Sequence, residues 1–593
     1  MRRKLDLLLS LLLSVLLLSV LLLGGCGSMK QAAKDFMNAV SGFSVNGEQH
    51  GTGMVRFDEM VYTRPDLEAM RESIDAAKKL LAAGTPYLKT SRMLDDCFKK
   101  YYSYYTMYNL ADIRCCQDLT DEYYAAEYSW CGENYAVVQQ LFDELYYACA
   151  ASSIAGELEE KYFWEGFTEQ YSDADSSYYN EQTVELMQQE SALIAEYRAL
   201  SANPTIERDG VEENYLDVLR ELEGEAYNSA LTQYYEKYNG KFADLFIRLV
   251  DVRNRLADML GFDSYEQMQF YYYFERDYTP EQAAGYIADI KEYMVPFYVE
   301  VVAEEPYDRL WYDDLSEKEL LGILGSVAGQ IGGQVEEAFD FMVQYGLYDA
   351  AVSSKKAAMS FQTYLSDYEA PFLFLDPYGD TEDILSFAHE FGHYADAYVN
   401  YDAYETIDVA EIFSQAMEYL TLSRLDSAMD REEAENVVRM KLLDTLELYV
   451  QQASFSEFES RVYTLGAENL SAEVLNDLSL ELAKEYGYFE EGYEEYYAMS
   501  WCDIPHFFEQ PFYVITYPVS NDIAMQIYTL EEQQNGLGLE KFMEILERDY
   551  EYFMDAVSAG GFESPFAPGR IESVVAQMRL HLDSRLDSQG AAA

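Results

Sequence analysis

Two histidines placed four residues apart constrain this chain more than any other feature. They are His389 and His393, and Glu390 follows the first of them within the run Asp383–Tyr398. Residues four apart lie on one face of an α-helix, so both imidazoles can bind a single metal ion if this segment is helical. Glu390 would lie beside them, where it can take a proton from an attacking water. The motif therefore predicts a helix that carries a zinc site and indicates peptide hydrolysis.

A short strand and a turn precede this predicted helix. Residues 371–375 form a bulky apolar run, which is typical of a buried or edge strand. Turn-forming residues follow at 376–380, and Asp380 or Thr381 can cap a helix over 381–399. The segment therefore predicts a strand, a turn and a capped helix that bears the metal-binding face.

A catalytic zinc site needs a third protein ligand besides two histidines and a water. The helical pattern over 407–419 places Glu411 among apolar neighbours, where a carboxylate is costly to bury unless it meets a cation. Glu411 is therefore the predicted ligand, in preference to Glu405, whose neighbours are more polar. Glu418 lies two turns further on the same helix face and is the predicted partner of a ligand histidine. The alternative is that Glu411 is an ordinary surface acid in an acidic chain.

A histidine and two tyrosines further along the chain can donate hydrogen bonds to a reacting carbonyl. Peptide hydrolysis places negative charge on the former carbonyl oxygen, and donors aimed at that oxygen lower the barrier. His506, Tyr513 and Tyr517 supply an imidazole N–H and two phenol O–H groups within one short segment. The alternative is a core histidine among structural tyrosines, since the chain has 55 tyrosines.

Together these segments resemble the M3 family of zinc metallopeptidases, and within it the bacterial oligoendopeptidase F branch. The resemblance rests on blocks that occur in the family's order, at 252–265, 371–393, 410–418 and 504–517. It implies a mainly α fold of the zincin type, with two helical lobes around a deep substrate channel. A small sheet would lie beside the HExxH helix, and the channel would admit short, unstructured peptides.

The resemblance also implies roles for individual residues. His389, His393 and Glu411 would hold Zn²⁺. Glu390 would be the general base, and His506 would stabilise the oxyanion together with a tyrosine.

Three features depart from the family pattern. His389 and Glu411 are 22 positions apart, which is fewer than in this branch, and Ile515 stands where many relatives carry another tyrosine. Pro518-Val-Ser520 replaces a small, glycine-containing turn. These departures leave the catalytic tyrosine open between Tyr513, which we place first, and Tyr517.

The N-terminus has the pattern of a bacterial lipoprotein signal. A positive start at 1–4 precedes a leucine-rich stretch that ends in Leu23-Gly-Gly-Cys26, a small-residue cleavage pattern. We therefore expect a signal peptide over 1–25, a lipidated Cys26 and a tether over 26–50. The acyl chains would hold the protein at the bacterial cell membrane, outside the cytoplasm. A plain transmembrane anchor is the alternative, since roughly 19 apolar residues nearly span a bilayer.

Composition and charge limit the remaining possibilities. A formal net charge of −66 argues against nucleic-acid binding, which needs a basic surface. The length of 593 residues suits at least two domains, and we expect an N-terminal helical domain over 51–250 and a catalytic domain over 251–585. An even number of cysteines after Cys26 permits disulfides, chiefly between residues 97 and 149. The clearest helical patterns cover 66–83, 183–202, 224–238, 241–259, 280–302 and 432–463.

These observations predict a zinc-dependent endopeptidase that hydrolyses internal bonds of short oligopeptides outside the cytoplasm. The strand at 371–375 would bind the peptide backbone by strand addition. One alternative is a peptide-binding lipoprotein linked to uptake, although a pure binder does not need a general base. The other is a zinc carboxypeptidase or dipeptidase on a related helical fold, which the block at 504–517 disfavours.

Overall fold

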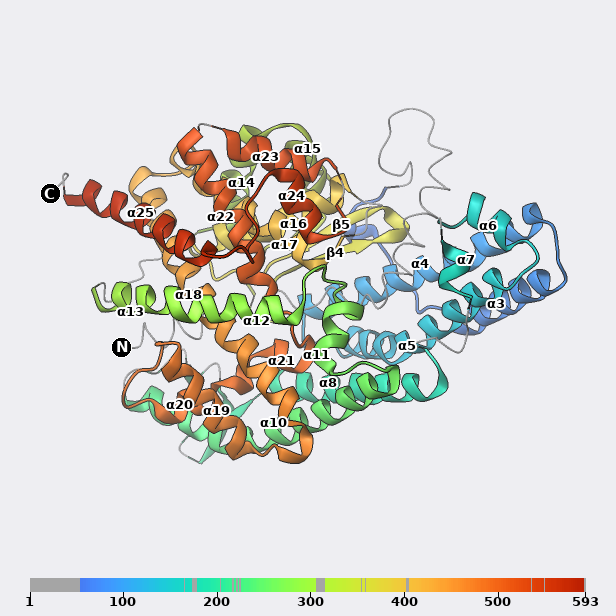
Figure 1. Ribbon diagram of the computed structural model, residues 1–593, viewed down its shortest axis with the longest axis horizontal. Helices are drawn as coiled ribbons and strands as arrows, with labels where there is room; N and C mark the ends of the chain where they lie inside the picture. Colours follow the sequence, from blue (N-terminus) through green and yellow to red (C-terminus); the bar gives the residue numbers. More distant parts are fainter. Residues whose placement is uncertain are drawn as a thin grey trace.

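The computed structural model describes residues 54–590, apart from 165, 173–178, 203, 209, 216–217, 220–221, 223–224, 305–314, 354, 358, 401–404, 535 and 549. The predicted signal peptide, Cys26 and the tether lie outside the described residues. Helices make up most of the described chain (Figure 1). None of the described helices combines the length and apolar character that crossing a membrane requires.

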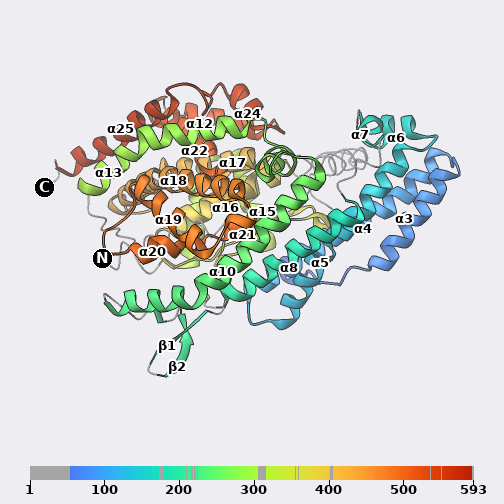
Figure 2. The same ribbon diagram turned by 60° about the horizontal axis from the view of Figure 1, so that its bottom comes forward.

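Long helices that lie side by side form the N-terminal part of the described chain. They are α3 (Leu67–Ala82), α4 (Tyr87–Gln117), α5 (Glu122–Ala150), α6 (Ala155–Lys161), α7 (Phe167–Gln170), α8 (Glu181–Ala202) and α10 (Glu225–Leu260). α4, α5, α8 and α10 are neighbours in a row, and α3 packs on α4 and α5 (Figure 2). Buried aromatic side chains such as Phe98, Phe142 and Tyr146 hold α4 and α5 together.

One of these helices joins two segments that the sequence pattern separates. The patterns over 224–238 and 241–259 predict two helices, but α10 runs without a break through Asn239 and Gly240. Gly240 is exposed, and a glycine in a helix interior costs only about 1 kcal/mol relative to alanine, which tertiary packing overrides. The predicted domain boundary at residue 250 falls inside α10, and the division into domains stays a prediction.

Three groups of helices connect this part of the chain to the helices that carry His389 and Glu411. They comprise α11 (Tyr265–Met268), the π-helical turn η4 (Gln269–Tyr273), α12 (Pro280–Asp289), the π-helical turn η5 (Ile290–Met294), α13 (Val295–Glu304), α14 (Glu317–Ile331) and α15 (Gly333–Tyr345). The pattern over 280–302 predicts one helix, and α12, η5 and α13 follow one another there. Thr279 begins the run with a capping box in which its hydroxyl accepts the N–H of Gln282.

Two small sheets are present among the described residues. β1 (Thr205–Arg208) and β2 (Val211–Asn214) form an antiparallel hairpin. β3 (Tyr348–Asp349), β4 (Phe361–Leu365) and β5 (Ala370–Phe374) form a sheet in the order β3-β5-β4. β5 is buried at every residue and packs against α16, so the predicted small sheet beside the motif helix is confirmed.

The position of β5 in its sheet corrects one prediction. The sequence pattern suggested that the strand at 371–375 binds a peptide by strand addition. β5 instead pairs with β4 along its whole length and with β3 at Leu373 and Phe374, so it is the middle strand. A strand that already has neighbours on both sides cannot take a further one there.

The C-terminal half carries the metal-site helices. They are α16 (Asp383–Val399), α17 (Ile407–Leu422), α18 (Arg431–Leu465), α19 (Ala472–Glu485), α20 (Glu494–Met499), α21 (Pro505–Glu509), α22 (Thr516–Gln534), α23 (Leu537–Leu546), α24 (Phe553–Gly560) and α25 (Arg570–Gly590). α17 packs between α16 and α22, and these helices lie together in the upper part of Figure 1. The mainly α fold predicted from the sequence is confirmed.

The start of α16 differs from the prediction. The helix begins at Asp383, with Glu382 in the capping position, so neither Asp380 nor Thr381 occupies that position. The Asp380 side chain nevertheless accepts the N–H of Glu382 at 2.8 Å, just before the helix. The Asp383 carboxylate instead accepts the N–H groups of Tyr378 and Gly379, at 2.8 and 2.7 Å. An acid inside the first turn thus orders the preceding turn, and the helix starts two residues later than expected.

The six cysteines among the described residues are all unpaired. They are Cys97, Cys115, Cys116, Cys131, Cys149 and Cys502. Burial raises the pKa of the Cys97 thiol to about 12 and that of the Cys131 thiol to about 12. The disulfides that the even count permitted are therefore absent among the described residues, and the five buried thiols are inert core side chains.

Candidate active site

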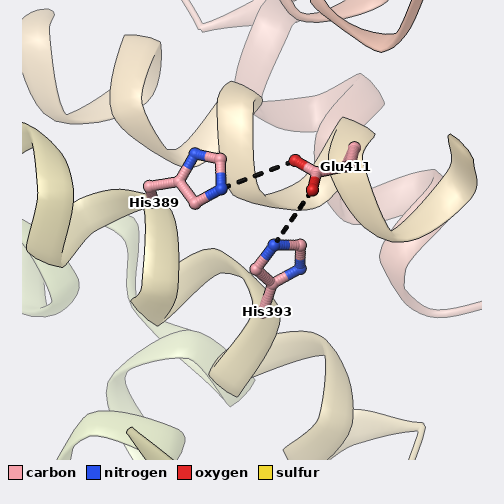
Figure 3. Close-up of side chains that lie close together, drawn as sticks. All are labelled: His389, His393 and Glu411. Carbon is pink, nitrogen blue, oxygen red and sulfur yellow. Dashed lines mark ion pairs between the residues drawn. The ribbon is translucent and has the colours of Figure 1, made fainter. Parts of the chain in front are cut away.

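The predicted metal ligands from α16 and α17 meet in the structure. The His389 Nε2 atom lies 3.5 Å from one Glu411 carboxylate oxygen, and the His393 Nε2 atom lies 3.7 Å from the other. Both imidazoles point at the same carboxylate (Figure 3). Ligand atoms from these residues all lie within 4.8 Å of one another. No other group of three such side chains is found in the described part of the chain, and Glu405 does not join this one.

The donor set fits a zinc ion. Two imidazole nitrogens and a carboxylate are the ligand types of catalytic zinc sites, which leave the fourth position for water or substrate. His389 Nε2 and Glu390 Oε2 are both buried and have no hydrogen-bond partner. Buried polar atoms without partners are costly, and a zinc ion with its water would satisfy both. Glu411 is fully buried, as the apolar sequence around it predicted.

A glycine in the motif allows α16 to approach α17. A Cβ atom at Gly392 would lie 2.5 Å from the Phe413 carbonyl oxygen and 2.5 Å from the Ser414 Cα. Backbone atoms cannot move aside at such distances without separating the helices. Gly392 therefore sets the spacing on which the approach of both histidines to Glu411 depends. Sequence reasoning passed over this residue, although glycine inside a helix marks a close backbone approach.

The second acid of α17 holds one ligand histidine. Glu418 Oε1 lies 2.8 Å from His389 Nδ1, which leaves Nε2 of that ring free to face the metal. Lys441 of α18 forms a buried ion pair with the other Glu418 oxygen. Burial alone would raise the pKa of Glu418, but Lys441 and His389 lower it below its usual value. The structure thus brings Glu418 to its predicted place and adds Lys441, which the sequence did not indicate.

Glu390 and His506 have shifted protonation equilibria. Burial raises the pKa of Glu390 to about 8, while the neighbouring His389 opposes this shift. Burial lowers the pKa of His506 to about 4, so its imidazole is neutral near pH 7 and can donate one N–H. A neutral imidazole is the state that such a hydrogen-bond donor requires. A carboxyl group with a pKa of about 8 is mostly protonated near pH 7, and a cation at the neighbouring ligand set would lower this pKa and favour the carboxylate that a general base requires.

The two candidate tyrosines both lie against His506 and against each other, but their hydroxyl groups have different partners. The Tyr513 hydroxyl donates to Glu411 Oε1 at 2.7 Å, and its ring centre lies 5.3 Å from that of His506. The Tyr517 hydroxyl lies 3.2 Å from His506 Nε2. Burial raises the pKa of both phenols well above the usual value, so both are protonated donors. Tyr513 therefore lies beside the predicted ligand Glu411, and Tyr517 lies beside His506, whereas the roles of the three side chains at the oxyanion stay a prediction.

A buried arginine fixes the loop that carries Tyr513. The Arg276 guanidinium donates to the Phe512 carbonyl oxygen at 2.9 Å and to the Thr516 hydroxyl at 2.7 Å. It also pairs with Asp408 of α17 at 3.1 Å, and neither side chain is exposed. Arg276 thus connects the tyrosine loop to the helix that bears Glu411, a role with no signal in the sequence.

A second buried arginine holds the short helix of His506. Arg253 of α10 donates to the carbonyl oxygens of Phe507 and Phe508, and its Nε pairs with Glu190 at 2.6 Å. The carbonyl groups at a helix C-terminus attract cations, so Arg253 suits the end of α21. The block at 252–265 pointed to this region without indicating the contact.

Comparison with known proteins identifies the family. The model of the peptidase M3 N-terminal domain matches residues 57–191, and that of peptidase family M3 matches residues 339–549. The chain belongs to peptidase family M3. It resembles oligoendopeptidase F within that family, and the predictions of an M3 metallopeptidase with zinc as its metal are confirmed.

Individual relatives support the assignment. The chain is 24% identical to oligopeptidase PepF of Bacillus subtilis (strain 168) over 226 residues, which are 36% of this chain and 33% of that protein. The fold resembles the structure of a putative oligoendopeptidase F with a TM-score of 0.77, at 24% identity over 89% of this chain and 99% of that one. It resembles a putative oligoendopeptidase F from Bacillus anthracis str. Ames with a TM-score of 0.74, at 23% identity over 89% and 98% of the two chains.

Proposed function

We propose that this M3 peptidase is an endopeptidase that hydrolyses internal bonds of short oligopeptides. The observation that carries the proposal is the meeting of His389, His393 and Glu411, with Glu390 next to the first ligand on α16. His506 is brought near this set because its ring contacts Tyr513, whose hydroxyl donates to Glu411. The names of the relatives, oligopeptidase and oligoendopeptidase, agree with a preference for short peptides.

The chemistry divides between the metal and the side chains. Zinc held by His389, His393 and Glu411 would act as a Lewis acid and lower the pKa of water. Glu390 takes the proton of the attacking water and passes it to the leaving amine, so no net proton is gained or lost. His506 donates a hydrogen bond to the oxygen on which negative charge develops.

The tyrosines complete the oxyanion site in the proposed mechanism. Tyr513 remains the first choice, because its hydroxyl already lies beside the metal ligands through its bond to Glu411. It would exchange this bond for one to the oxyanion as charge develops. Tyr517 contacts His506 and so orients the imidazole N–H. Both roles require a protonated phenol, in agreement with the raised pKa values.

We further propose that peptides are bound in the channel implied by the family resemblance, with their backbone beside the sheet. The strand order leaves β4 at the edge, so β4 replaces β5 as the strand to which a peptide would add. Asn109 of α4 already donates to the Tyr364 carbonyl oxygen at 2.9 Å. This contact leaves the start of β4, near Phe361, as the part of the edge for a peptide.

We propose that the protein acts outside the cytoplasm, anchored to the bacterial membrane by lipid on Cys26. The support is the sequence pattern at Leu23–Cys26. Substitution of Cys26 by serine should release the protein from the membrane fraction and abolish incorporation of an alkyne-labelled fatty acid. Unchanged labelling of Cys26→Ser would refute lipidation at this residue.

Cleavage of a quenched-fluorescent peptide library by the full chain, with mass spectrometry of the products, tests the activity. Internal cuts in short peptides are expected, and both a zinc chelator and Glu390→Gln should abolish them. Glu473→Gln, which makes the same change on an exposed helix of the chain, is the matched control and should cleave normally. Release of single or paired terminal residues would indicate an exopeptidase instead. Tight peptide binding without turnover, unchanged in Glu390→Gln, would indicate the peptide-binding lipoprotein.

A further inference from the structure

A cavity of about 300 Å³ lies next to the loop that carries Tyr513, and none of the metal ligands lines it. Phe512 and Ile515 of that loop form one wall, and α12 and α18 form others. Ala284 and Ala288 of α12 line the cavity and are exposed, so it opens to the surface between these small side chains. Apolar side chains such as Phe270 make up most of the lining.

A buried carboxylate with a free oxygen marks the inner end of the cavity. Glu459 of α18 is completely buried and lines the cavity. Its Oε1 accepts the N–H of Phe512 at 2.9 Å, whereas its Oε2 has no hydrogen-bond partner. An unpartnered buried carboxylate oxygen is costly, and it requires a donor that the described chain does not supply.

Further acids surround this oxygen. Glu266 lines the same cavity, and its carboxylate accepts only the Ser460 hydroxyl at 2.7 Å among the hydrogen bonds of the described residues. Burial raises the pKa of Glu266, and burial raises the pKa of Glu459 to about 8, with the charge of Glu266 adding to the shift of Glu459. A cation between the two would relieve this repulsion.

The nearby basic side chains are committed elsewhere. Arg253 donates to Glu190 and to backbone carbonyls of α21, and Arg276 pairs with Asp408. At the rim, Lys291 contacts Glu457 at 3.1 Å. The described basic groups therefore leave the inner carboxylates without a direct partner.

We propose that this cavity binds a small organic ammonium ion with an apolar body. The ammonium group would donate to Glu459 Oε2 and to Glu266, and the body would pack against Phe270 and Ile515. Charge-assisted hydrogen bonds to buried carboxylates and an apolar enclosure are together the features of a small-molecule site. The volume suits a ligand of about the size of an aromatic amine.

The cavity is connected to the active site through the backbone. Glu459 holds the N–H of Phe512, which has a positive φ of 66° that side-chain-bearing residues rarely adopt. The next residue is Tyr513, whose hydroxyl donates to Glu411. A ligand that draws Glu459 toward itself shifts the Phe512 backbone and with it the tyrosine. Occupation of the cavity therefore alters turnover without contact with the metal ligands.

Calorimetric titration of the full chain with benzylammonium, and separately with benzyl alcohol, tests the site. The two probes share an aromatic body, and only the first carries charge. Benzylammonium should bind with a dissociation constant at least tenfold lower than that of benzyl alcohol. The titration needs no catalysis, so its outcome is independent of the proposed peptidase activity.

Three variants locate the binding. Glu459→Gln should weaken benzylammonium binding at least tenfold, and Ala288→Trp should block the opening and abolish it. Gly285→Ala changes the neighbouring exposed position of α12, where a Cβ meets no atom within 4 Å, and should bind normally. Because Ala288 is exposed, its variant should fold even if the Glu459 variant does not.

The same titration separates a free amine from a peptide's own ammonium group. A short peptide substrate at saturating concentration should leave benzylammonium binding unchanged, since the cavity lies behind the tyrosine loop. Displacement of benzylammonium by the peptide would overturn the inference of a separate site. Equal binding of benzyl alcohol, absence of benzylammonium binding, or unaltered binding by Ala288→Trp would also overturn it.

Discussion

The hydrogen bond between Glu418 and His389 should determine how tightly the protein holds zinc. The Glu418 carboxylate serves two donors, His389 Nδ1 at 2.8 Å and the Lys441 ammonium. In Glu418→Gln the side chain keeps one acceptor oxygen and gains an NH₂ group. One of the two buried donors then faces another donor, and the negative charge that orients the imidazole is lost.

Loss of such a partner typically reduces metal affinity 10- to 100-fold, which corresponds to about 1.4–2.8 kcal/mol. We expect a value toward the upper end, because both side chains are buried and water cannot replace the carboxylate. Competition with a chromophoric chelator at pH 7 measures the zinc dissociation constant directly. Saturating zinc should restore most of the activity, since the general base Glu390 is unchanged.

Glu481→Gln is the matched control for this prediction. Glu481 also pairs with a basic side chain, Arg461 at 3.0 Å, but it is on the surface and far from the metal ligands in sequence. Its zinc affinity should equal that of the parent. A zinc dissociation constant for Glu418→Gln within twofold of the parent value would refute the reasoning.

Three further changes test other parts of the structure. Gly392→Ala should lose zinc on dialysis and show no activity, because its Cβ would lie 2.5 Å from the Phe413 carbonyl oxygen; zinc content by atomic absorption checks this. Asp408→Ala leaves Arg276 buried without its partner, so the urea midpoint should fall by the equivalent of about 3–5 kcal/mol, whereas an unchanged midpoint would contradict the buried pair. Burial raises the pKa of Asp503 to about 6, so its folded state binds a proton more tightly than the unfolded state. The contribution of Asp503 to the free energy of unfolding is therefore present at low pH and is lost as pH rises through about 6. Relative to Asp503→Asn, the free energy of unfolding of the parent should fall by up to about 3 kcal/mol between pH 4 and pH 7.5, as measured by urea titration.

The metal ligands could be predicted because each leaves a local pattern. The spacing of His389 and His393 defines a helix face, and the apolar neighbours of Glu411 mark a carboxylate that needs a cation. Glu418 follows from helix periodicity on the same element. These inferences need only the geometry of a single helix.

The supporting contacts could not be predicted because they join distant segments. Lys441 reaches Glu418 from another helix, and Arg276 reaches Phe512 across more than two hundred residues. The periodicity of a single helix does not predict such contacts, because they depend on how whole helices pack against one another. The start of α16 was misplaced because several acids compete at its N-terminus. Asp380 accepts the N–H of Glu382, Asp383 accepts two N–H groups of the preceding turn, and the regular helix begins only at Asp383.

The placement of two functional acids on α17 limits how this chain can change in length. One added residue between Glu411 and Glu418 would turn the second acid by about 100° around the helix, away from His389. Added or lost residues between Asn400 and Thr406 leave the faces of α16 and α17 intact. Insertions and deletions should therefore accumulate between the two helices and be absent between Glu411 and Glu418. A tag or linker that must leave the metal site unharmed belongs in that connection.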